Sequence, residues 1–178
     1  MKKYGVIYAD PPWRYKAWSG HGTVEKHYPT MELEDIMALP VGEIADKDCA
    51  LFLWATLPML KEALQVIKAW GFKYKTTAFV WIKLNRQGDG IFWGMGYWTR
   101  ANAEICLLAT KGHPKRRAKN IHQVIISHVE EHSKKPEEAR RRASEETDSI
   151  SLPLRAKATY PSVPSSFQNY DRCAGSQF

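Results

Sequence analysis

Apolar runs separated by polar and glycine-rich stretches recur along most of the chain. Residues 5–9 (GVIYA) and 49–55 (CALFLWA) are almost entirely apolar, as are strands that are buried on both faces of a sheet. Residues 75–83 (KTTAFVWIK) are rich in β-branched and aromatic side chains, which favours a third strand. Two further strands are expected over residues 104–110 and 121–127.

One stretch has helical rather than strand periodicity. Leu60, Leu64 and Ile67 form one apolar stripe at i, i+4 and i+7, in a segment that is capped by Thr56 and stops at Gly71. This helix lies between two strand-like segments, an order that is typical of a covered, largely parallel sheet. The chain is therefore predicted to have an α/β fold. Shorter helices are expected over residues 32–38, with Thr30 as the cap, and over residues 136–146.

Two long loops and an irregular tail complete the expected organisation. Residues 10–29 and 85–99 are rich in glycine and aromatic residues and show no period, and long loops inside compact domains are often functional. Residues 147–178 are rich in serine and proline. The sequence therefore predicts one folded domain over residues 1–146 and an irregular tail over residues 147–178.

The charge of the chain favours an anionic partner. Lysine and arginine number 26 against 19 aspartate and glutamate, a formal net charge of +7, which suits nucleic acid. None of the three cysteines forms a C-x-x-C pair, which favours a reducing compartment. No apolar run approaches the roughly 20 residues that span a bilayer, and no signal peptide precedes the first strand. A cytoplasmic protein without a membrane segment is expected.

The strongest chemical signal is Asp10-Pro11-Pro12-Trp13, directly after the first apolar run. Ligands of open α/β sheets bind at the C-terminal ends of strands, and two prolines stiffen the turn that follows the carboxylate. The Asp10 carboxylate and the Pro11 carbonyl can accept the two hydrogens of an adenine amino group, which aims the nitrogen lone pair at an electrophilic methyl group. Trp13 offers a flat face for the base. The structural alternative is a stiff strand exit with a core tryptophan.

Several motifs together carry a resemblance to a known family. Besides Asp10-Pro11-Pro12-Trp13 they are residues 27–31 (HYPTM), 51–56 (LFLWAT), 96–112 (GYWTRANAEICLLATKG) and 132–136 (HSKKP). Their order resembles that of the DPPW-type adenine-N6 methyltransferases, the bacterial and phage relatives of the catalytic subunit of the eukaryotic messenger-RNA N6-adenosine methyltransferase. The resemblance implies a Rossmann-like methyltransferase sheet, S-adenosylmethionine as methyl donor, and adenine in DNA or RNA as acceptor. DNA is favoured for a small stand-alone chain.

The same resemblance implies roles for individual residues. Asp10 to Trp13 hold the acceptor amino group, and Asp10 and Lys135 lie where donor and acceptor meet. Further substrate-binding positions are Tyr28 and Trp98 as walls of the base pocket, and Arg100, Asn102 and Glu104 along the cleft.

The C-terminal part departs from the family. Relatives carry a strand resembling E-L-F-A-R and then a W-x-x-W-G-N-E segment, and residues 142–178 contain neither. A sheet without its terminal strand is therefore one expectation. Two functions stay open: an adenine-N6 methyltransferase, or a nucleic-acid-binding pseudo-enzyme that has lost its donor site. The choice between monomer and homodimer stays open as well.

Three weaker signals have a structural as well as a functional interpretation. In the basic connector, residues 111–119, Arg116 and Arg117 are candidates for contacts with substrate phosphates, although a solvated loop has the same composition. Trp93 in the glycine-rich loop is either a stacking residue or part of the core. Residues 128–132 match H-x-x-E-H, but they follow a strand and run into HSKKP, so a loop without a metal is expected.

Overall fold

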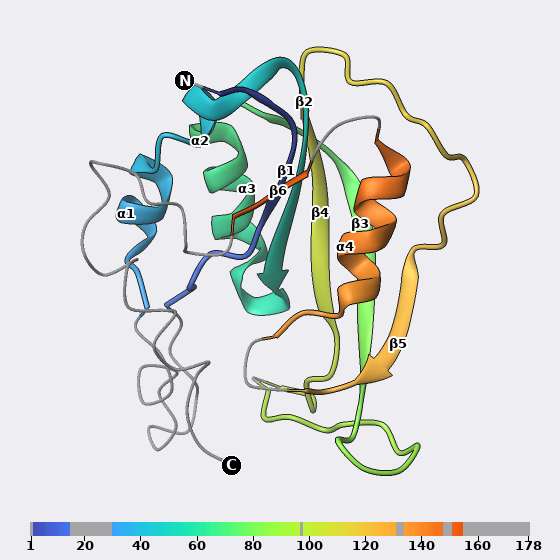
Figure 1. Cartoon of the computed structure of the whole chain (residues 1–178). Coiled ribbons are helices and arrows are strands. Elements are labelled where there is room, and N and C mark those ends of the chain that lie inside the picture. The colour runs from blue at the N-terminus through green and yellow to red at the C-terminus, as the bar shows by residue number, and fades with distance from the viewer. Residues whose placement is uncertain (1, 15–29, 97, 131–133, 148–150, 155–178) are drawn as a thin grey trace, which may run out of the picture.

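The structure, a computed structural model, describes residues 2–14, 30–96, 98–130, 134–147 and 151–154. It has the α/β architecture that the sequence predicts (Figure 1). The strands are β1 (Tyr4–Ala9), β2 (Ala45–Thr56), β3 (Lys73–Leu84), β4 (Glu104–Lys111), β5 (Val124–His128) and β6 (Ser151–Leu154). The helices are α1 (Leu33–Ala38), α2 (Val41–Ile44), α3 (Leu60–Ala69) and α4 (Glu137–Glu146), with a 3-10 turn (Leu57–Met59) before α3.

Helices cover both faces of the sheet, which explains the long apolar run in the inner strand β2. The helices α1, α2 and α3 lie on one face, and α4 lies on the other (Figure 1). Successive residues of β2 alternate between the two cores: Leu51 and Leu53 pack on the α3 side, whereas Phe52 and Trp54 pack on the α4 side. Two-sided burial therefore accounts for the near-continuous apolar run of residues 49–55.

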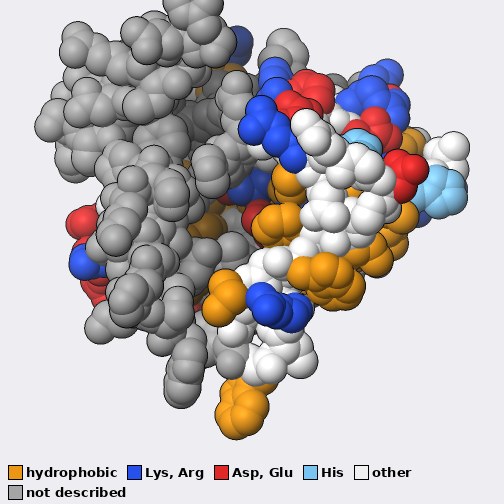
Figure 2. Space-filling view, turned by 90° about the horizontal axis from the view of Figure 1, so that it is seen from below, with side chains coloured by type: hydrophobic (Ala, Val, Ile, Leu, Met, Phe, Trp, Pro, Cys, Tyr) orange, Lys and Arg blue, Asp and Glu red, His pale blue; other side chains and the backbone are white. Residues whose placement is uncertain are grey.

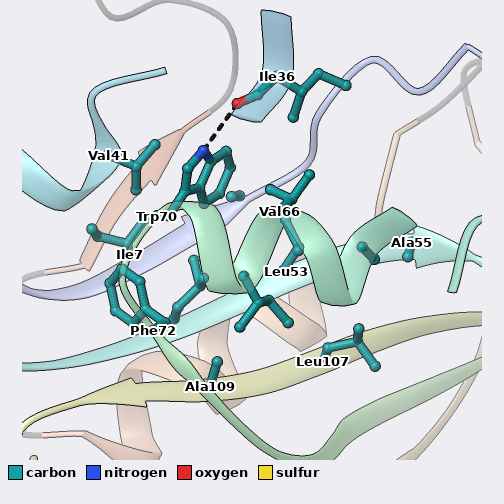
Figure 3. Close-up of a cluster of buried hydrophobic side chains, with 14 of the residues drawn as sticks. Ile7, Ile36, Val41, Leu53, Ala55, Val66, Trp70, Phe72, Leu107 and Ala109 are labelled. Atoms are coloured by element: carbon teal, nitrogen blue, oxygen red, sulfur yellow. Dashed lines mark hydrogen bonds between the residues drawn. The ribbon is translucent and has the colours of Figure 1, made fainter. Parts of the chain in front are cut away.

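Trp70 joins the helices on the α3 side of the sheet (Figure 3). Its indole Nε1, just beyond the last residue of α3, donates to the carbonyl oxygen of Ile36 in α1 at 2.9 Å. Both residues pack in the same core as Ile7 and Leu53 of the sheet. The hydrogen bond satisfies the one polar atom of a large buried side chain and fixes α1 against α3.

The apolar stripe predicted for α3 is only partly correct. Ile67 is buried, but the other buried residues of the helix are Ala63 and Val66, and Leu60 and Leu64 are each 38% exposed. The buried face of α3 is therefore formed by Ala63, Val66 and Ile67.

The helix ends are predicted correctly at one position and incorrectly at two. Gly71 ends α3 with a φ of 82°, a conformation that favours glycine. Thr56 precedes the 3-10 turn and its side chain makes no capping hydrogen bond. Thr30 is not the cap of α1, because the helix begins after Glu32.

The strand order places most strand C-termini at one edge of the sheet. The order among the described residues is β5-β3-β4-β2-β1-β6, and the pairs β1–β2, β1–β6 and β3–β5 are parallel. The prediction of a largely parallel sheet is confirmed, and the exception is β4, which is antiparallel to both β2 and β3. The reason is that β4 follows β3 through a hairpin-like loop, without a crossover helix. The first residue of β4 therefore lies at the edge where β1 and β2 end.

The tail differs from the expectation at four residues. Ser151–Leu154 form β6, which pairs in parallel with β1 from Val6 and Ser151 to Ala9 and Leu154. A four-residue segment is too short to show a hydrophobic period in the sequence. Pro153 has no backbone N–H, and an edge strand tolerates this because one of its sides has no neighbouring strand to bond. The position beside β1 is thus held by a four-residue strand. The division into a domain over 1–146 and a tail over 147–178 stays a prediction.

Candidate active site

Three segments that are distant in the sequence bring charged side chains together at the C-terminal edge of the sheet. Asp10 directly follows β1, Glu104 is the first residue of β4, and Lys135 precedes α4. The Lys135 Nζ donates to Asp10 Oδ2 at 3.0 Å and lies 3.3 Å from Glu104 Oε2. In Figure 2, which shows the molecule from below, basic and acidic side chains lie in a hollow at this end.

A second lysine extends this arrangement. Lys83 near the end of β3 donates from its Nζ to Glu104 Oε1 at 2.5 Å. Lys83, Glu104, Lys135 and Asp10 thus form a row of alternating charges, here called the charge ladder. Their side chains are only 10% to 19% exposed. Such pairs interact more strongly than surface ion pairs, because little water screens them.

The charge ladder keeps Glu104 and Lys135 ionised against the cost of burial. Burial opposes the charge of Glu104, but Lys135 and Lys83 outweigh that effect and hold its pKa below the ordinary value. Burial likewise opposes the charge of Lys135, and Asp10 and Glu104 reverse the effect and raise its pKa. The pKa shifts of Glu104 and Lys135 thus both favour the charged form of the side chain.

Indole rings support the ladder from the α4 side of the sheet. The Lys135 Nζ lies 5.8 Å from the centre of the Trp54 ring, and the Lys83 Nζ lies 5.1 Å from that of Trp81. Trp54 is itself fixed, because its Nε1 donates to the Tyr8 hydroxyl at 2.6 Å. Burial raises the pKa of Tyr8, so the hydroxyl stays neutral. Both lysines of the charge ladder therefore pack against the indole rings of buried tryptophans.

Trp13 does not have the expected role of a stacking face. It is only 5% exposed, belongs to the core on the α3 side, and donates from Nε1 to the Trp54 carbonyl oxygen at 2.9 Å. Its backbone N–H donates to the Pro11 carbonyl oxygen at 2.9 Å, and the Pro12 carbonyl accepts from Met31. Trp13 therefore anchors the turn that presents Asp10. The Pro11 carbonyl retains a second lone pair for a ligand.

Asn102 also acts differently from the substrate contact that the resemblance implies. Its Oδ1 accepts from the Lys83 backbone N–H at 3.0 Å, and its Nδ2 donates to the carbonyl oxygens of Lys83 and Phe92. These bonds fasten the base of the loop between β3 and β4. Asn102 is therefore a structural residue of the loop.

No contact between the other predicted residues of this loop and the charge ladder is seen among the described residues. Arg100 contacts the Met95 sulfur through Nη1 at 3.4 Å. Trp98 is 99% exposed, so it lines no pocket formed by the described residues. Trp93 is 62% exposed, which excludes the core interpretation. Tyr28 lies outside the described residues.

Arg116 and Arg117 lie at the other end of the molecule. Arg116 forms a β-bridge with Thr147, and the backbone N–H of Arg117 donates to the Glu146 carbonyl at 2.8 Å. Both arginines therefore lie beside the C-terminal end of α4, whereas Lys135 precedes its N-terminal end. The helix has 10 residues, which corresponds to about 15 Å. The structure does not bring these arginines to the charge ladder.

Two polar residues of the site were not found from the sequence. Lys83 closes the predicted third strand, and its only signal is a charge at the end of an otherwise buried strand. Thr56 ends β2 opposite Glu104 in the β2–β4 register. Its buried Oγ1 has no hydrogen-bond partner among the described residues. A bound ligand that satisfies this hydroxyl would remove its desolvation cost.

The H-x-x-E-H match shows no metal centre in the part that is described. His128 Nδ1 lies 2.7 Å from the Asn85 carbonyl oxygen, and residues 131–133 lie outside the described residues. Within the described ranges no group of His, Cys, Asp and Glu is arranged to hold a metal ion. In the same ranges no helix is long and apolar enough to cross a membrane.

Comparison with known proteins identifies the family. The sequence profile described as MT-A70 matches residues 4–158. The chain belongs to the MT-A70 family. It is 35% identical to the Type II methyltransferase M.MunI of a Mycoplasma species, over 76% of its own length and 64% of that protein.

Eukaryotic N(6)-adenosine-methyltransferases are also similar to the chain. The chain is 31% identical to the N(6)-adenosine-methyltransferase MT-A70-like of Arabidopsis thaliana, over 76% of its own length and 18% of that protein. It is 29% identical to the human N(6)-adenosine-methyltransferase catalytic subunit METTL3, over 78% of its own length and 23% of that protein. This MT-A70 chain therefore spans less than two thirds of each of these relatives.

Replacing Glu104 by glutamine should change how stability depends on acid. Ionised Glu104 stabilises the folded state above its unfolded pKa of about 4.3, and this contribution is lost as pH falls through the lower folded pKa. Glu104→Gln has no such charge to lose, so its free energy of unfolding should fall less steeply between about pH 5 and pH 2. At pH 7 it should be about 2 kcal/mol less stable, because both lysines lose a charged partner.

Urea unfolding at a series of pH values measures this difference. Glu137→Gln on the exposed surface of α4 is the control, and its acid dependence should match that of the unmodified chain. Parallel pH curves for Glu104→Gln and the unmodified chain would show that the ladder does not stabilise the fold.

Proposed function

We propose that this chain transfers a methyl group from S-adenosylmethionine to the N6 amino group of adenine in nucleic acid, with DNA as the favoured substrate. The observation that carries the proposal is the Asp10 carboxylate, which ends β1 and is held at 3.0 Å by Lys135 at a partly open sheet edge. Relatives named as methyltransferases, two of them N(6)-adenosine-methyltransferases, support the same reaction. A nucleic acid partner is supported by the net charge of +7 and by the family resemblance. The preference for DNA is supported by the small size of the chain, and a cytoplasmic location by the absence of a C-x-x-C pair and of a long apolar run.

The Asp10 turn has acceptors for both hydrogens of an adenine amino group. A carboxylate has two oxygens with about four lone-pair sites, so Asp10 can accept an amino hydrogen in addition to its bond from Lys135, and the Pro11 carbonyl has a lone pair beyond its bond to Trp13. Bound in this way, the amino nitrogen directs its lone pair out of the ring plane. When the amino nitrogen has accepted the methyl group it carries a positive charge and must lose one of its two hydrogens as a proton. Asp10 is the nearby base that can accept this proton.

The residues at this edge also fit a cationic donor. Asp10 offers a carboxylate, and the buried Thr56 hydroxyl lacks a partner among the described residues, so both can contact polar groups of a bound ligand. S-adenosylmethionine supplies an electrophilic methyl group on a sulfonium sulfur. Asp10, Lys135 and Thr56 are the residues that would hold it beside the acceptor. Lys135 fixes the carboxylate so that it need not reorganise during the reaction.

A second function has one observation in its favour. The strand beside β1 has only four residues, and it replaces the longer family segment that the sequence lacks. A chain with an incomplete donor site would bind nucleic acid without transferring a methyl group. We therefore keep a nucleic-acid-binding remnant as the alternative.

Asp10→Ala should reduce methyl transfer by at least about 100-fold, because it removes an acceptor that acts at the reacting nitrogen. The fold should persist, since Lys135 keeps Glu104 as a partner. The assay transfers labelled methyl groups from S-adenosylmethionine to DNA and to RNA, with the modified base identified by mass spectrometry. Asp35→Ala in the first turn of α1 is the matched control and should be fully active.

Two results would contradict the proposal in different ways. Normal activity of folded Asp10→Ala would exclude the mechanism. Oligonucleotide binding by the unmodified chain, without calorimetric heat from donor binding and without methyl transfer, would establish the remnant instead.

The position of Arg116 and Arg117 predicts a dependence on substrate length. They lie one helix length from the ladder, and about 15 Å corresponds to about four or five base pairs. Changing both to glutamine should leave the affinity for very short oligonucleotides unchanged. For oligonucleotides of about 20 base pairs it should weaken binding equally for all sequences and lower the salt slope by about one per arginine.

Fluorescence anisotropy at several salt concentrations measures these affinities. Arg141→Gln is the control, because Arg141 is an exposed residue of α4 that already pairs with Glu138 and Glu145. An altered sequence preference, or the same loss of affinity for the shortest oligonucleotides, would exclude remote phosphate contacts.

A further inference from the structure

The loop between β3 and β4 exposes large apolar side chains beside the candidate active site. Trp98 is 99% exposed, Met95 70%, Trp93 62% and Ile91 44%. Figure 2 shows hydrophobic side chains projecting from this end of the molecule. Large indole rings are usually buried for most of their surface, so a fully exposed tryptophan marks a binding surface.

The loop is built to hold this exposed conformation. Gly94 and Ala101 exchange two backbone hydrogen bonds, at 2.7 and 3.3 Å, which close the tip into a short hairpin. A Cβ atom on Gly96 would lie 2.0 Å from the Thr99 carbonyl oxygen, so the tip requires glycine there. The projecting position of Trp98 is therefore defined by the surrounding backbone.

The base of the loop is fastened to the charge ladder itself. The Asn102 side chain bonds the backbone of Lys83, whose ammonium group in turn bonds Glu104. Asn102 is two residues before Glu104, at the same sheet edge. Trp98 therefore lies, fully exposed, in a loop whose base is attached at the sheet edge where Asp10 lies.

The chemistry of the loop fits a nucleobase. Residues 85–103 contain Arg86 and Arg100 against one acidic residue, Asp89, which favours an anionic ligand. A flat indole gains affinity by stacking on any base, whatever its identity. When an adenine leaves the stack to reach Asp10, the base next to it loses a stacking partner.

We propose that Trp98 stacks on the nucleobase next to the target adenine and so holds the strand open while the target lies at Asp10. This inference rests on the proposed function and adds a contact outside the base pocket. Trp98 is thus a substrate-positioning residue that replaces the lost stacking partner.

The test compares Trp98→Ala, Trp98→Phe and Trp98→Leu, because phenylalanine keeps a flat ring and leucine keeps only apolar area. Affinity is measured with oligonucleotides that carry fluorescent 2-aminopurine next to the target adenine. Trp98→Ala and Trp98→Leu should bind about tenfold more weakly, and Trp98→Phe should keep most of the affinity. The fluorescence of 2-aminopurine should be quenched by the unmodified chain and by Trp98→Phe only.

Ile126→Ala is the control, since Ile126 is an exposed apolar residue of β5, 64% accessible, outside the loop. It should bind like the unmodified chain. The KM for methyl transfer should rise in Trp98→Ala and Trp98→Leu in parallel with their loss of affinity, and it should change little in Trp98→Phe.

The failure of this inference differs from the failure of the proposed function. Unchanged affinity and quenching in Trp98→Ala would overturn the stacking contact even if methyl transfer is normal. Equal behaviour of Trp98→Phe and Trp98→Leu, with a Trp98-dependent dimer in sedimentation, would assign the surface to a second copy and overturn it too. Quenching without methyl transfer would support the contact and refute the enzyme, and no oligonucleotide binding by the unmodified chain would refute both.

Discussion

The ammonium group of Lys135 lies between two carboxylates, and the geometry of the site depends on it. The bond from Lys135 to Asp10 joins residues that are 125 positions apart in the sequence. An ammonium group in this partly buried position is costly with one partner alone. Glu104 supplies the second negative charge, and Lys83 balances Glu104 in turn. Asp10 is thus held by a row of charges in which each member compensates its neighbour.

The direction of β4 is what makes this row possible. In an all-parallel sheet, the C-terminal residues of every strand would meet at the ligand-binding edge. Because β4 is antiparallel to β2 and β3, its first residue, Glu104, lies at that edge instead. The loop that reverses the chain also emerges there, and its exposed indoles border the site. The connection between β3 and β4 therefore has two effects. It brings Glu104 into the charge ladder, and it places a loop with exposed indoles at the same sheet edge.

The sequence predicted the parts of the molecule that depend on local pattern. The apolar runs correctly predicted β1 and the inner part of β2. The motif that begins at Asp10 predicted a carboxylate directly after the first strand. Pattern did not show contacts between distant segments. Lys83 is unremarkable in the sequence because its role depends on Glu104, which lies across a sheet pairing. Trp13 looks like a stacking residue until the carbonyl of Trp54 is seen to accept its indole N–H.

A double-mutant cycle between the two ends of the ladder tests this account most directly. No sequence pattern relates Lys83 to Asp10, and the structure links them through Glu104 and Lys135. The free energy of unfolding is measured for Lys83→Met, Asp10→Asn and the double variant by urea titration. If the ladder acts as one unit, the two effects should differ from additivity by about 1 kcal/mol or more. Additivity within about 0.3 kcal/mol would show that the two pairs are independent and would contradict the account.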